Sequence, residues 1–276
     1  MKGKKVFGES VTRLEDPDLL TGNGRFVDDI ILPGLLHAAF VRSPHAHALV
    51  KNIDKTPALK VDGIHGVFTL KDFRPYLVNE KLVVGLPSPS YRQDLNRPAL
   101  ADGEVVHVGE PVAIVVAESR YLAEDSASLV DVEYQPLPVV SDCQYALGEN
   151  VPTVHSESSH NVLDEFEMGY GEVKEAFKNA KHVFAEKFWQ HRGGSHSIEC
   201  RGSVASYDHT QNLLTLYSAT QAPHTAKEIL IDMLGWDENQ IRVIIPDVGG
   251  GFGPKLVFYP EDVSVVLSAL ILERPV

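Results

Sequence analysis

Residues 247–255 read Asp-Val-Gly-Gly-Gly-Phe-Gly-Pro-Lys, and they follow an apolar run at residues 241–246 that predicts a buried strand. Glycine lets the backbone adopt positive φ and approach another group closely. Successive N–H groups in such a turn can face an anion or an oxo group. The stretch therefore predicts either a binding loop or a plain tight turn between a strand and a helix.

The two common phosphate-binding patterns do not fit this loop. A P-loop needs Ser or Thr directly after its Gly-Lys pair, whereas Lys255 follows Pro254 and precedes Leu256. The dinucleotide pattern needs glycine at its sixth position, which is Pro254 when counting begins at Gly249. Proline also lacks the N–H that a phosphate cradle would use. We therefore expect the loop to bind something other than a nucleotide phosphate in these ways, or to bind nothing.

Composition bounds the class of protein. The chain has 276 residues, is 43% hydrophobic and carries a formal net charge of −13. This hydrophobic content is typical of a folded protein with one large or two ordinary domains. The negative charge disfavours attraction to nucleic acid or to an anionic membrane, so we expect neither partner. The longest apolar run, residues 263–272, is too short to span a bilayer, and residues 1–9 lack a signal-peptide core.

Cysteine usage points to a reducing compartment. The two cysteines, Cys143 and Cys200, lie far apart in the sequence. Two thiols can build neither a disulfide framework nor an iron–sulfur site made from this chain alone. We predict two buried, reduced thiols and a cytoplasmic location.

Strand-like and helical runs alternate, which predicts an α+β fold in two domains. A stretch with few apolar runs, residues 141–165, marks the boundary between them. We expect strands at residues 35–41, 112–117, 131–134, 182–189, 202–207 and 213–218. We expect helices at residues 120–130, with Ser119 as the N-cap, and at 172–180, 224–234 and 261–272.

Several segments resemble, in the same order, the large subunit of molybdenum hydroxylases, the family of xanthine dehydrogenase, aldehyde oxidase and aerobic carbon monoxide dehydrogenase. The loop resembles the Gly-Gly-Gly-Phe-Gly-x-Lys segment of that family. Each motif alone is weak to moderate, but together they are specific. The other matching segments are residues 13–29, 40–47, 109–117, 123–127, 132–137, 196–202 and 218–224.

The resemblance implies an α+β architecture with three parts. These are an α/β hammerhead domain at residues 1–145, a connector at 146–165, and the first part of a molybdopterin-binding domain at 166–276. It also implies a molybdenum ion held by the pterin dithiolene, with no metal ligand from the protein. We expect the cytosine dinucleotide form of molybdopterin, which bacterial members usually carry.

The resemblance also assigns site residues. It places Gln221 beside an oxygen ligand of molybdenum, where a neutral amide donates a hydrogen bond without adding charge. On sequence alone, a solvated turn glutamine is the alternative. Gly250, Gly251, Phe252 and Gly253 are expected to bring their backbone against the cofactor, and a core aromatic is a second role for Phe252.

Other polar residues have structural interpretations. His196, Glu199 and Arg201 are predicted to cluster in a strand-like stretch, where a Glu–Arg pair positions the backbone rather than binding metal. His45 and His47 are predicted to share a strand face and to line a surface or an interdomain contact, with metal binding as the alternative.

The two residues after Pro254 bear on pairing and on the substrate. Lys255 either pairs with an acidic residue or is solvated. Leu256 stands where the purine-oxidising branch of the family carries a glutamate that contacts substrate. The resemblance therefore disfavours xanthine and leaves the substrate open.

Large subunits of the family are much longer than this chain, and their remaining part carries the glutamate general base. The resemblance therefore implies that a second molybdopterin-binding polypeptide, or a missing C-terminal half, completes the site and covers exposed apolar surface. We expect the chain alone to have no turnover. The complete enzyme would oxidise a heterocycle, an aldehyde or CO with water as oxygen source.

Electrons from that reaction would pass to [2Fe–2S] and FAD on partner subunits. Two other interpretations compete with this one. A non-catalytic assembly module would leave the metal mainly on another chain. An unrelated nucleotide-binding α/β enzyme would bind ATP or NAD tightly.

Overall fold

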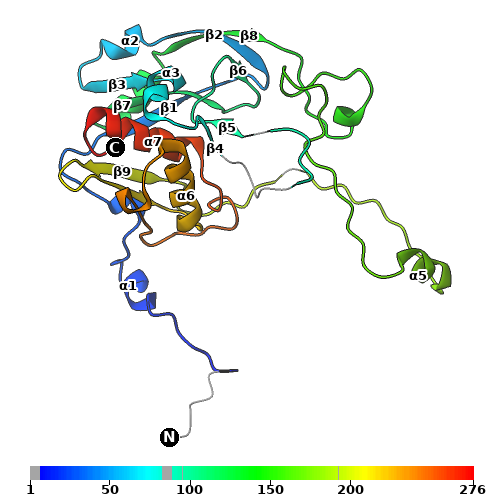
Figure 1. Cartoon of the computed structure of the whole chain (residues 1–276). Coiled ribbons are helices and arrows are strands. Elements are labelled where there is room, and N and C mark those ends of the chain that lie inside the picture. Colours follow the sequence, from blue (N-terminus) through cyan, green and yellow to red (C-terminus); the bar gives the residue numbers. More distant parts are fainter. Residues whose placement is uncertain (1–6, 83–88, 95, 192) are drawn as a thin grey trace, which may run out of the picture.

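The computed structural model describes residues 7–82, 89–94, 96–191 and 193–276. Most of them form one body of small sheets and helices, from which the N-terminal segment and α5 extend (Figure 1). The first sheet has the order β1-β7-β3 and is antiparallel throughout. Its strands are β1 (His37–Arg42), β7 (Pro111–Ala117) and β3 (Ile64–Phe68). The central strand β7 is buried at every position, as its unbroken apolar sequence predicts.

A second antiparallel sheet has the order β6-β2-β8. Its strands are β6 (Glu104–Val105), β2 (Ala48–Asp54) and β8 (Asp131–Pro136). Helix α4 (Arg120–Ala127) connects β7 to β8 and packs on β1 and β7. Ser119 caps it as predicted, because its hydroxyl accepts a hydrogen bond from the N–H of Leu122 at 3.2 Å.

The third sheet has the order β11-β10-β9. Strands β9 (Ser203–Asp208) and β10 (Leu213–Ser218) form the predicted hairpin. Strand β11 (Ile241–Ile244) pairs with β10 in parallel, which requires a crossover, and α6 (Pro223–Leu234) supplies it. Shorter elements complete the described fold: helices α1 (Asp16–Leu20), α2 (Thr56–Leu59) and α3 (Leu70–Phe73), the strand pair β4 (Lys81–Leu82) and β5 (Arg97–Pro98), and 3₁₀ turns at Val27–Asp29, Arg74–Tyr76, Tyr145–Leu147 and Glu238–Gln240.

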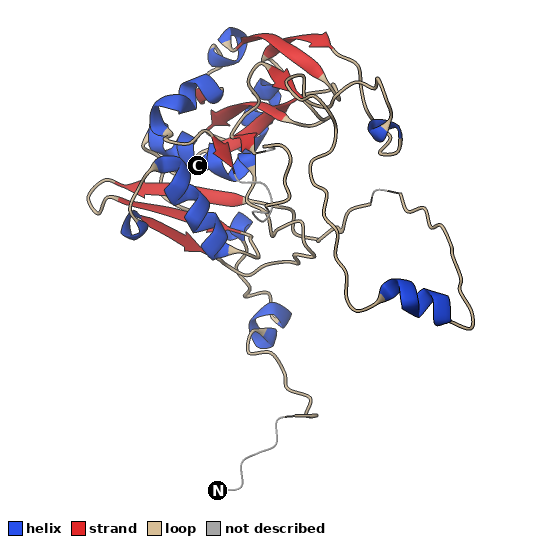
Figure 2. Cartoon of the chain, turned by 45° about the vertical axis from the view of Figure 1, so that its right-hand side comes forward, coloured by secondary structure: helices blue, strands red, loops and turns tan. Residues whose placement is uncertain are grey.

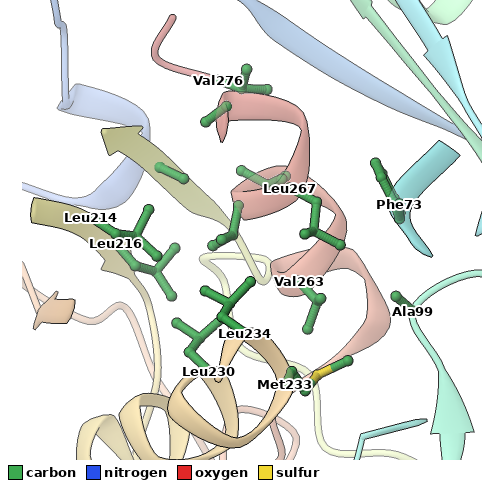
Figure 3. Close-up of a cluster of buried hydrophobic side chains, with 14 of the residues drawn as sticks. Phe73, Ala99, Leu214, Leu216, Leu230, Met233, Leu234, Val263, Leu267 and Val276 are labelled. Atoms are coloured by element: carbon green, nitrogen blue, oxygen red, sulfur yellow. The ribbon is translucent and has the colours of Figure 1, made fainter. Parts of the chain in front are cut away.

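Helix α7 (Pro260–Leu272) joins the two halves of the molecule. The first half contains the first two sheets, and the second half contains the sheet of β9, β10 and β11. The helix packs against β9 and also against β3 and β7. Residues 263–269 are all buried, so the helix has no solvent face over this length. Leu267 therefore lies in one continuous core with Phe73 of the first half and with Leu214 and Leu230 of the second (Figure 3).

Residues 166–198 lie away from this core. Helix α5 (Val173–Asn179) confirms the predicted helix, and two views show it far from the sheets (Figures 1 and 2). The strand predicted at residues 182–189 is wrong, because this extended segment pairs with no described strand and so forms no ladder. The large apolar side chains exposed in this region are Phe166, Met168, Tyr170, Val173, Phe177, Val183, Phe184, Phe188, Trp189 and Ile198.

The prediction of buried thiols is also wrong. Cys143 and Cys200 are both free and exposed. Each lies in an irregular segment outside the three sheets, where little of the chain packs over it. Among the described helices, none combines the length and the apolar character needed to cross a membrane.

Candidate functional site

The glycine run forms the loop between β11 and α7. Gly250 has φ 101°, Phe252 has φ 55° and Gly253 has φ 97°. Positive φ is ordinary for glycine but uncommon for a bulky residue, and it marks a turn or a functional position. Phe252 is 69% exposed, so the role as a core aromatic is wrong. The left-handed turn leaves its ring beside Gly250, where a Cβ would lie 2.8 Å from Cε2 of Phe252.

Two side-chain oxygens hold the ends of this loop. Oε2 of Glu199 accepts a hydrogen bond from the N–H of Gly249 at 2.8 Å. Oε1 of Gln221 accepts one from the N–H of Gly253 at 3.0 Å. Within the described part of the chain, no group accepts a hydrogen bond from the N–H groups of residues 250–252. The loop is thus anchored at both ends and presents donors between them.

Gln221 lies in the short connection between β10 and α6. Because its Oε1 is engaged by Gly253, its NH₂ group is left as a donor, and none of the described residues accepts from it. A Cβ placed on Gly251 would lie 2.5 Å from Cδ of Gln221. Glycine at position 251 is therefore needed for the glutamine side chain to lie against the loop.

Lys255 is buried and paired, which confirms one of the two alternatives for it. Its Nζ lies 2.7 Å from Oε2 of Glu199, and the two side chains are 1% and 18% exposed. The carbonyl of Lys255 accepts hydrogen bonds from the N–H of Gln221 at 2.8 Å and from Oγ1 of Thr220 at 3.1 Å. The predicted pairing of Glu199 with Arg201 is wrong, because the lysine reaches Glu199 across the loop.

Arg201 instead belongs to an ion cluster that links the two halves. Its Nη2 lies 3.5 Å from Oε1 of Glu261, and Nη1 of Arg42 lies 2.8 Å from the same oxygen. The guanidinium of Arg201 lies 3.6 Å from the ring centroid of Tyr259. Although burial opposes ionisation, the charges of Arg201 and Arg42 hold the pKa of Glu261 below its ordinary value.

Two cavities, of about 320 Å³ and 190 Å³, flank this cluster. Neither is lined by residues 249–253. The larger lies at the junction of β1, β9 and α7, and the smaller lies between β5, residues 107–111 and the start of α7. Asp262 lines the larger cavity and keeps some accessible surface, but burial of its carboxyl raises its pKa to about 6.

The predicted placement of the three histidines is wrong. His45 and His47 lie in the turn between β1 and β2, so they do not share a strand face. His47 is buried, with Nε2 2.8 Å from Oε1 of Glu104, and the ring of His45 contacts that of Tyr134. His196 is exposed and irregular in conformation. Within the described ranges, no group of three or more His, Cys, Asp or Glu residues could hold a metal ion.

The roles of Glu199 and Asp247 in building the loop did not follow from the sequence. Glu199 was expected to pair with its neighbour, not to hold Gly249. Asp247 was not singled out, yet its Oδ2 accepts from the N–H of Arg25 at 2.7 Å and its own N–H donates to the Arg25 carbonyl at 2.7 Å. The available signal is an acidic residue two positions before the first glycine of the run, because it can anchor the start of the loop.

The site offers mainly neutral donors. The N–H groups of residues 250–252 and the NH₂ group of Gln221 suit an oxygen-rich group that lies against the loop. Oε1 of Glu199 is buried without a described hydrogen-bond partner, which leaves one acceptor nearby. These residues fit a cofactor that carries oxo and carbonyl oxygens and brings its own metal ligands.

Comparisons with known proteins agree with this fit. Residues 21–138 match the aldehyde oxidase and xanthine dehydrogenase a/b hammerhead domain, and residues 154–276 match the molybdopterin cofactor-binding domain. The chain is 39% identical to the nicotine 6-hydroxylase large subunit of Paenarthrobacter nicotinovorans, over 99% of this chain and 33% of that protein. It is 35% identical to the carbon monoxide dehydrogenase large chain of Afipia carboxidovorans, over 96% of this chain and 33% of that protein.

A solved structure gives the same result. Quinoline 2-oxidoreductase from Pseudomonas putida 86 matches with a TM-score of 0.88 and 37% identity, over 97% of this chain and 34% of that one. The chain therefore spans about a third of the length of these relatives. The limits predicted at residues 1–145, 146–165 and 166–276 stay a prediction. The chain belongs to the molybdenum hydroxylase family, and it carries the family's hammerhead domain and a molybdopterin cofactor-binding domain.

Proposed function

We propose that this chain binds the molybdopterin cofactor of a molybdenum hydroxylase against residues 250–253 and Gln221. The observation that carries the proposal is the row of N–H groups at residues 250–252, which have no described acceptor and lie beside the donor end of Gln221. The match of residues 154–276 to a molybdopterin cofactor-binding domain supplies the class of ligand.

The chain's own residues bind and orient in this proposal. Gln221 would donate from its NH₂ group to an oxygen of the bound cofactor, and the backbone of residues 250–253 would lie against it. When bound, the cofactor supplies a two-electron oxidation of substrate with water as oxygen source. Neutral donors stabilise charge that develops on oxygen without adding charge to the ground state. We infer the cytosine dinucleotide form of the cofactor.

Further polypeptide is part of the proposed enzyme. Residues 166–198 lie within the part matched to the cofactor-binding domain, yet large apolar side chains in this segment are exposed. Folded domains rarely leave so much apolar surface in contact with water. A second molybdopterin-binding polypeptide, or the rest of a longer chain, would cover it and supply the general base. This chain alone would then turn over no substrate.

We infer electron transfer to [2Fe–2S] and FAD subunits in the cytoplasm. The names "large subunit" and "large chain" of the relatives support an assembly of several subunits. The substrate would be a small molecule, namely a heterocycle, an aldehyde or CO. Leu256, 55% exposed directly after the loop, offers an apolar contact where a charged one would favour a purine.

A non-catalytic assembly module is the second candidate, and the exposed surface of residues 166–198 favours it. In that case the chain would serve as an interface while another chain held the metal. Metal and pterin analysis of the assembled enzyme, followed by separation of its polypeptides, distinguishes the two functions.

The decisive variant is Gln221→Ala in the assembled enzyme. We expect kcat to fall by about a hundredfold, because loss of one donor at a developing oxyanion has an effect of this order. Gln211→Ala, in the exposed turn between β9 and β10, is the matched control and should leave kcat unchanged. If molybdenum stays wholly on a partner and Gln221→Ala is as active as the control, the assembly module is correct.

A further inference from the structure

We propose that Lys255 and Glu199 act as one positioning unit that sets the geometry of the glycine loop, without contacting substrate. The inference rests on the proposed function only for the identity of the ligand. The contacts that carry it lie within this chain.

The first contact of the unit is at the start of the loop. A single oxygen of Glu199, Oε2, receives both Nζ of Lys255 at 2.7 Å and the N–H of Gly249 at 2.8 Å. The N–H of Glu199 also donates to the carbonyl of Gly249 at 3.4 Å. The two backbone segments approach so closely that a Cβ on Gly249 would lie 2.5 Å from Cβ of Glu199. The position of the carboxylate therefore sets the position of the first glycine.

The second contact is at the end of the loop. The carbonyl of Lys255 accepts from the N–H of Gln221 at 2.8 Å, and Oε1 of Gln221 in turn accepts from the N–H of Gly253 at 3.0 Å. Lys255 thus reaches one anchor of the loop with its ammonium and the other with its backbone. A shift of this one residue would move both anchors together.

Charge compensation explains why the two side chains should act as a unit. The ammonium is almost fully buried and the carboxylate is mostly so. Removing one member leaves the other as an unpaired charge in a poorly solvated place, whereas removing both does not. Because Oε2 of Glu199 also holds Gly249, relaxation of an unpaired carboxylate toward water would pull the loop out of place.

The nearby ion cluster of Arg42, Arg201 and Glu261 does not hold the N–H of Gly249 or of Gly253. Arg201 pairs with Glu261 and lies over Tyr259, at the junction of β1 with α7. No hydrogen bond or ion pair of the described residues links Glu261 to residues 249–253. The junction reaches the loop only beyond Gly253, where the hydroxyl of Tyr259 donates to the carbonyl of Pro254 at 2.7 Å. The N–H of Gly249 is held by Glu199.

The test uses the assembled enzyme with Lys255→Met, Glu199→Gln and the double variant. Hydrogen exchange of residues 249–253, molybdenum content per chain, kcat and KM are measured for each. We expect either single change to speed exchange in the loop about tenfold. Loss of a hydrogen bond to a charged group raises the equilibrium constant for local opening by a factor of this order. We expect kcat to fall with KM nearly unchanged, and the double variant to be no worse than the worse single variant.

Lys55→Met is the matched control. Nζ of Lys55 lies 2.8 Å from Oδ2 of Asp72 in an ion pair of the first half, so this change removes a paired lysine far along the chain from the loop. It should leave exchange at residues 249–253 and the molybdenum content at wild-type values. Glu199→Gln preserves side-chain shape, so it tests the idea even where Lys255→Met fails to fold.

The outcomes separate this inference from the proposed function. Loop exchange and kcat that match the control in both single variants, or single effects that add in the double variant, would overturn the positioning unit. Wild-type enzyme that carries no molybdenum on this chain would instead overturn the proposed function. The effect of Lys255→Met on loop exchange is measurable in either case.

Discussion

At the scale of single residues, the site depends on how closely backbone and side chains approach. Gly251 and Gln221 show this most directly, because the space for a Cβ at position 251 is taken by the glutamine side chain. Gly253 is different, since nothing lies within 4 Å of its Cβ position and its φ of 97° alone requires glycine. One glycine makes room for a neighbour, and the other permits the turn.

Gly251→Ala tests the first of these roles. The added methyl would displace the Gln221 side chain, so we expect kcat of the assembled enzyme to fall at least about tenfold, as small misplacements in active sites do. Gly169→Ala is the control, because that glycine has open space and no positive φ. Steady-state kinetics of both variants measure the effect, and equal kcat values would contradict the placement of Gln221.

At the scale of elements, local sequence accounts for most of the helices and strands. The run of buried residues in β7 and the hairpin of β9 and β10 follow directly from apolar pattern and turn residues. The segment at residues 182–189 has similar residue types but forms no strand. A strand needs a neighbour for its backbone groups, and none of the described strands lies beside this one.

The N-cap of α4 gives a prediction at this scale. Ser119→Ala removes the acceptor for the N–H of Leu122, so we expect the free energy of unfolding to fall by about 1 kcal/mol. Urea unfolding followed by circular dichroism measures it. Ser128→Ala, at the exposed other end of the helix, is the control and should change stability by less than about 0.5 kcal/mol.

At the scale of the whole molecule, α7 makes one core from two domains. Phe73 and Leu267 belong to the same buried cluster, and the ion cluster of Arg42, Arg201 and Glu261 spans the same junction. The glycine loop leads directly into this helix. The hammerhead half therefore supports the cofactor-binding half through α7 and, at the start of the loop, through the hydrogen bonds between Arg25 and Asp247.

The junction predicts a pH dependence of stability through Asp262. Its folded pKa of about 6 lies above the ordinary value of 3.8, so the unfolded chain releases this proton first. The contribution of Asp262 to stability is fully present below about pH 4 and is lost as pH rises through about 6, by about 3 kcal/mol for a shift of this size. The lowered pKa of Glu261 acts in the opposite sense, at pH values below its ordinary 4.5.

Asp262→Asn isolates this effect. Asparagine keeps an oxygen for the N–H of Tyr259, which Oδ2 of Asp262 accepts at 3.1 Å, but it does not titrate. We expect the variant to gain stability relative to wild type as pH rises from 5 to 7, in chemical unfolding measured at several pH values. A difference between the two proteins that stays constant over this range would contradict the raised pKa.

Local pattern was enough to predict the fold class, most elements and the glycine loop, whereas the family resemblance singled out Gln221. Periodicity and turn residues report on the backbone close by in sequence, and these features depend on little else. The ordered motifs also identified the family, because each of them records the same local backbone and side-chain requirements.

Contacts between segments far apart in the sequence could not be predicted from local pattern. Three findings depend on which segments meet: Lys255 rather than Arg201 pairs with Glu199, both cysteines are exposed, and His47 is buried against Glu104. Burial and pairing are properties of the packed molecule, since the same side chain is charged and solvated, or paired and dry, according to what lies across from it.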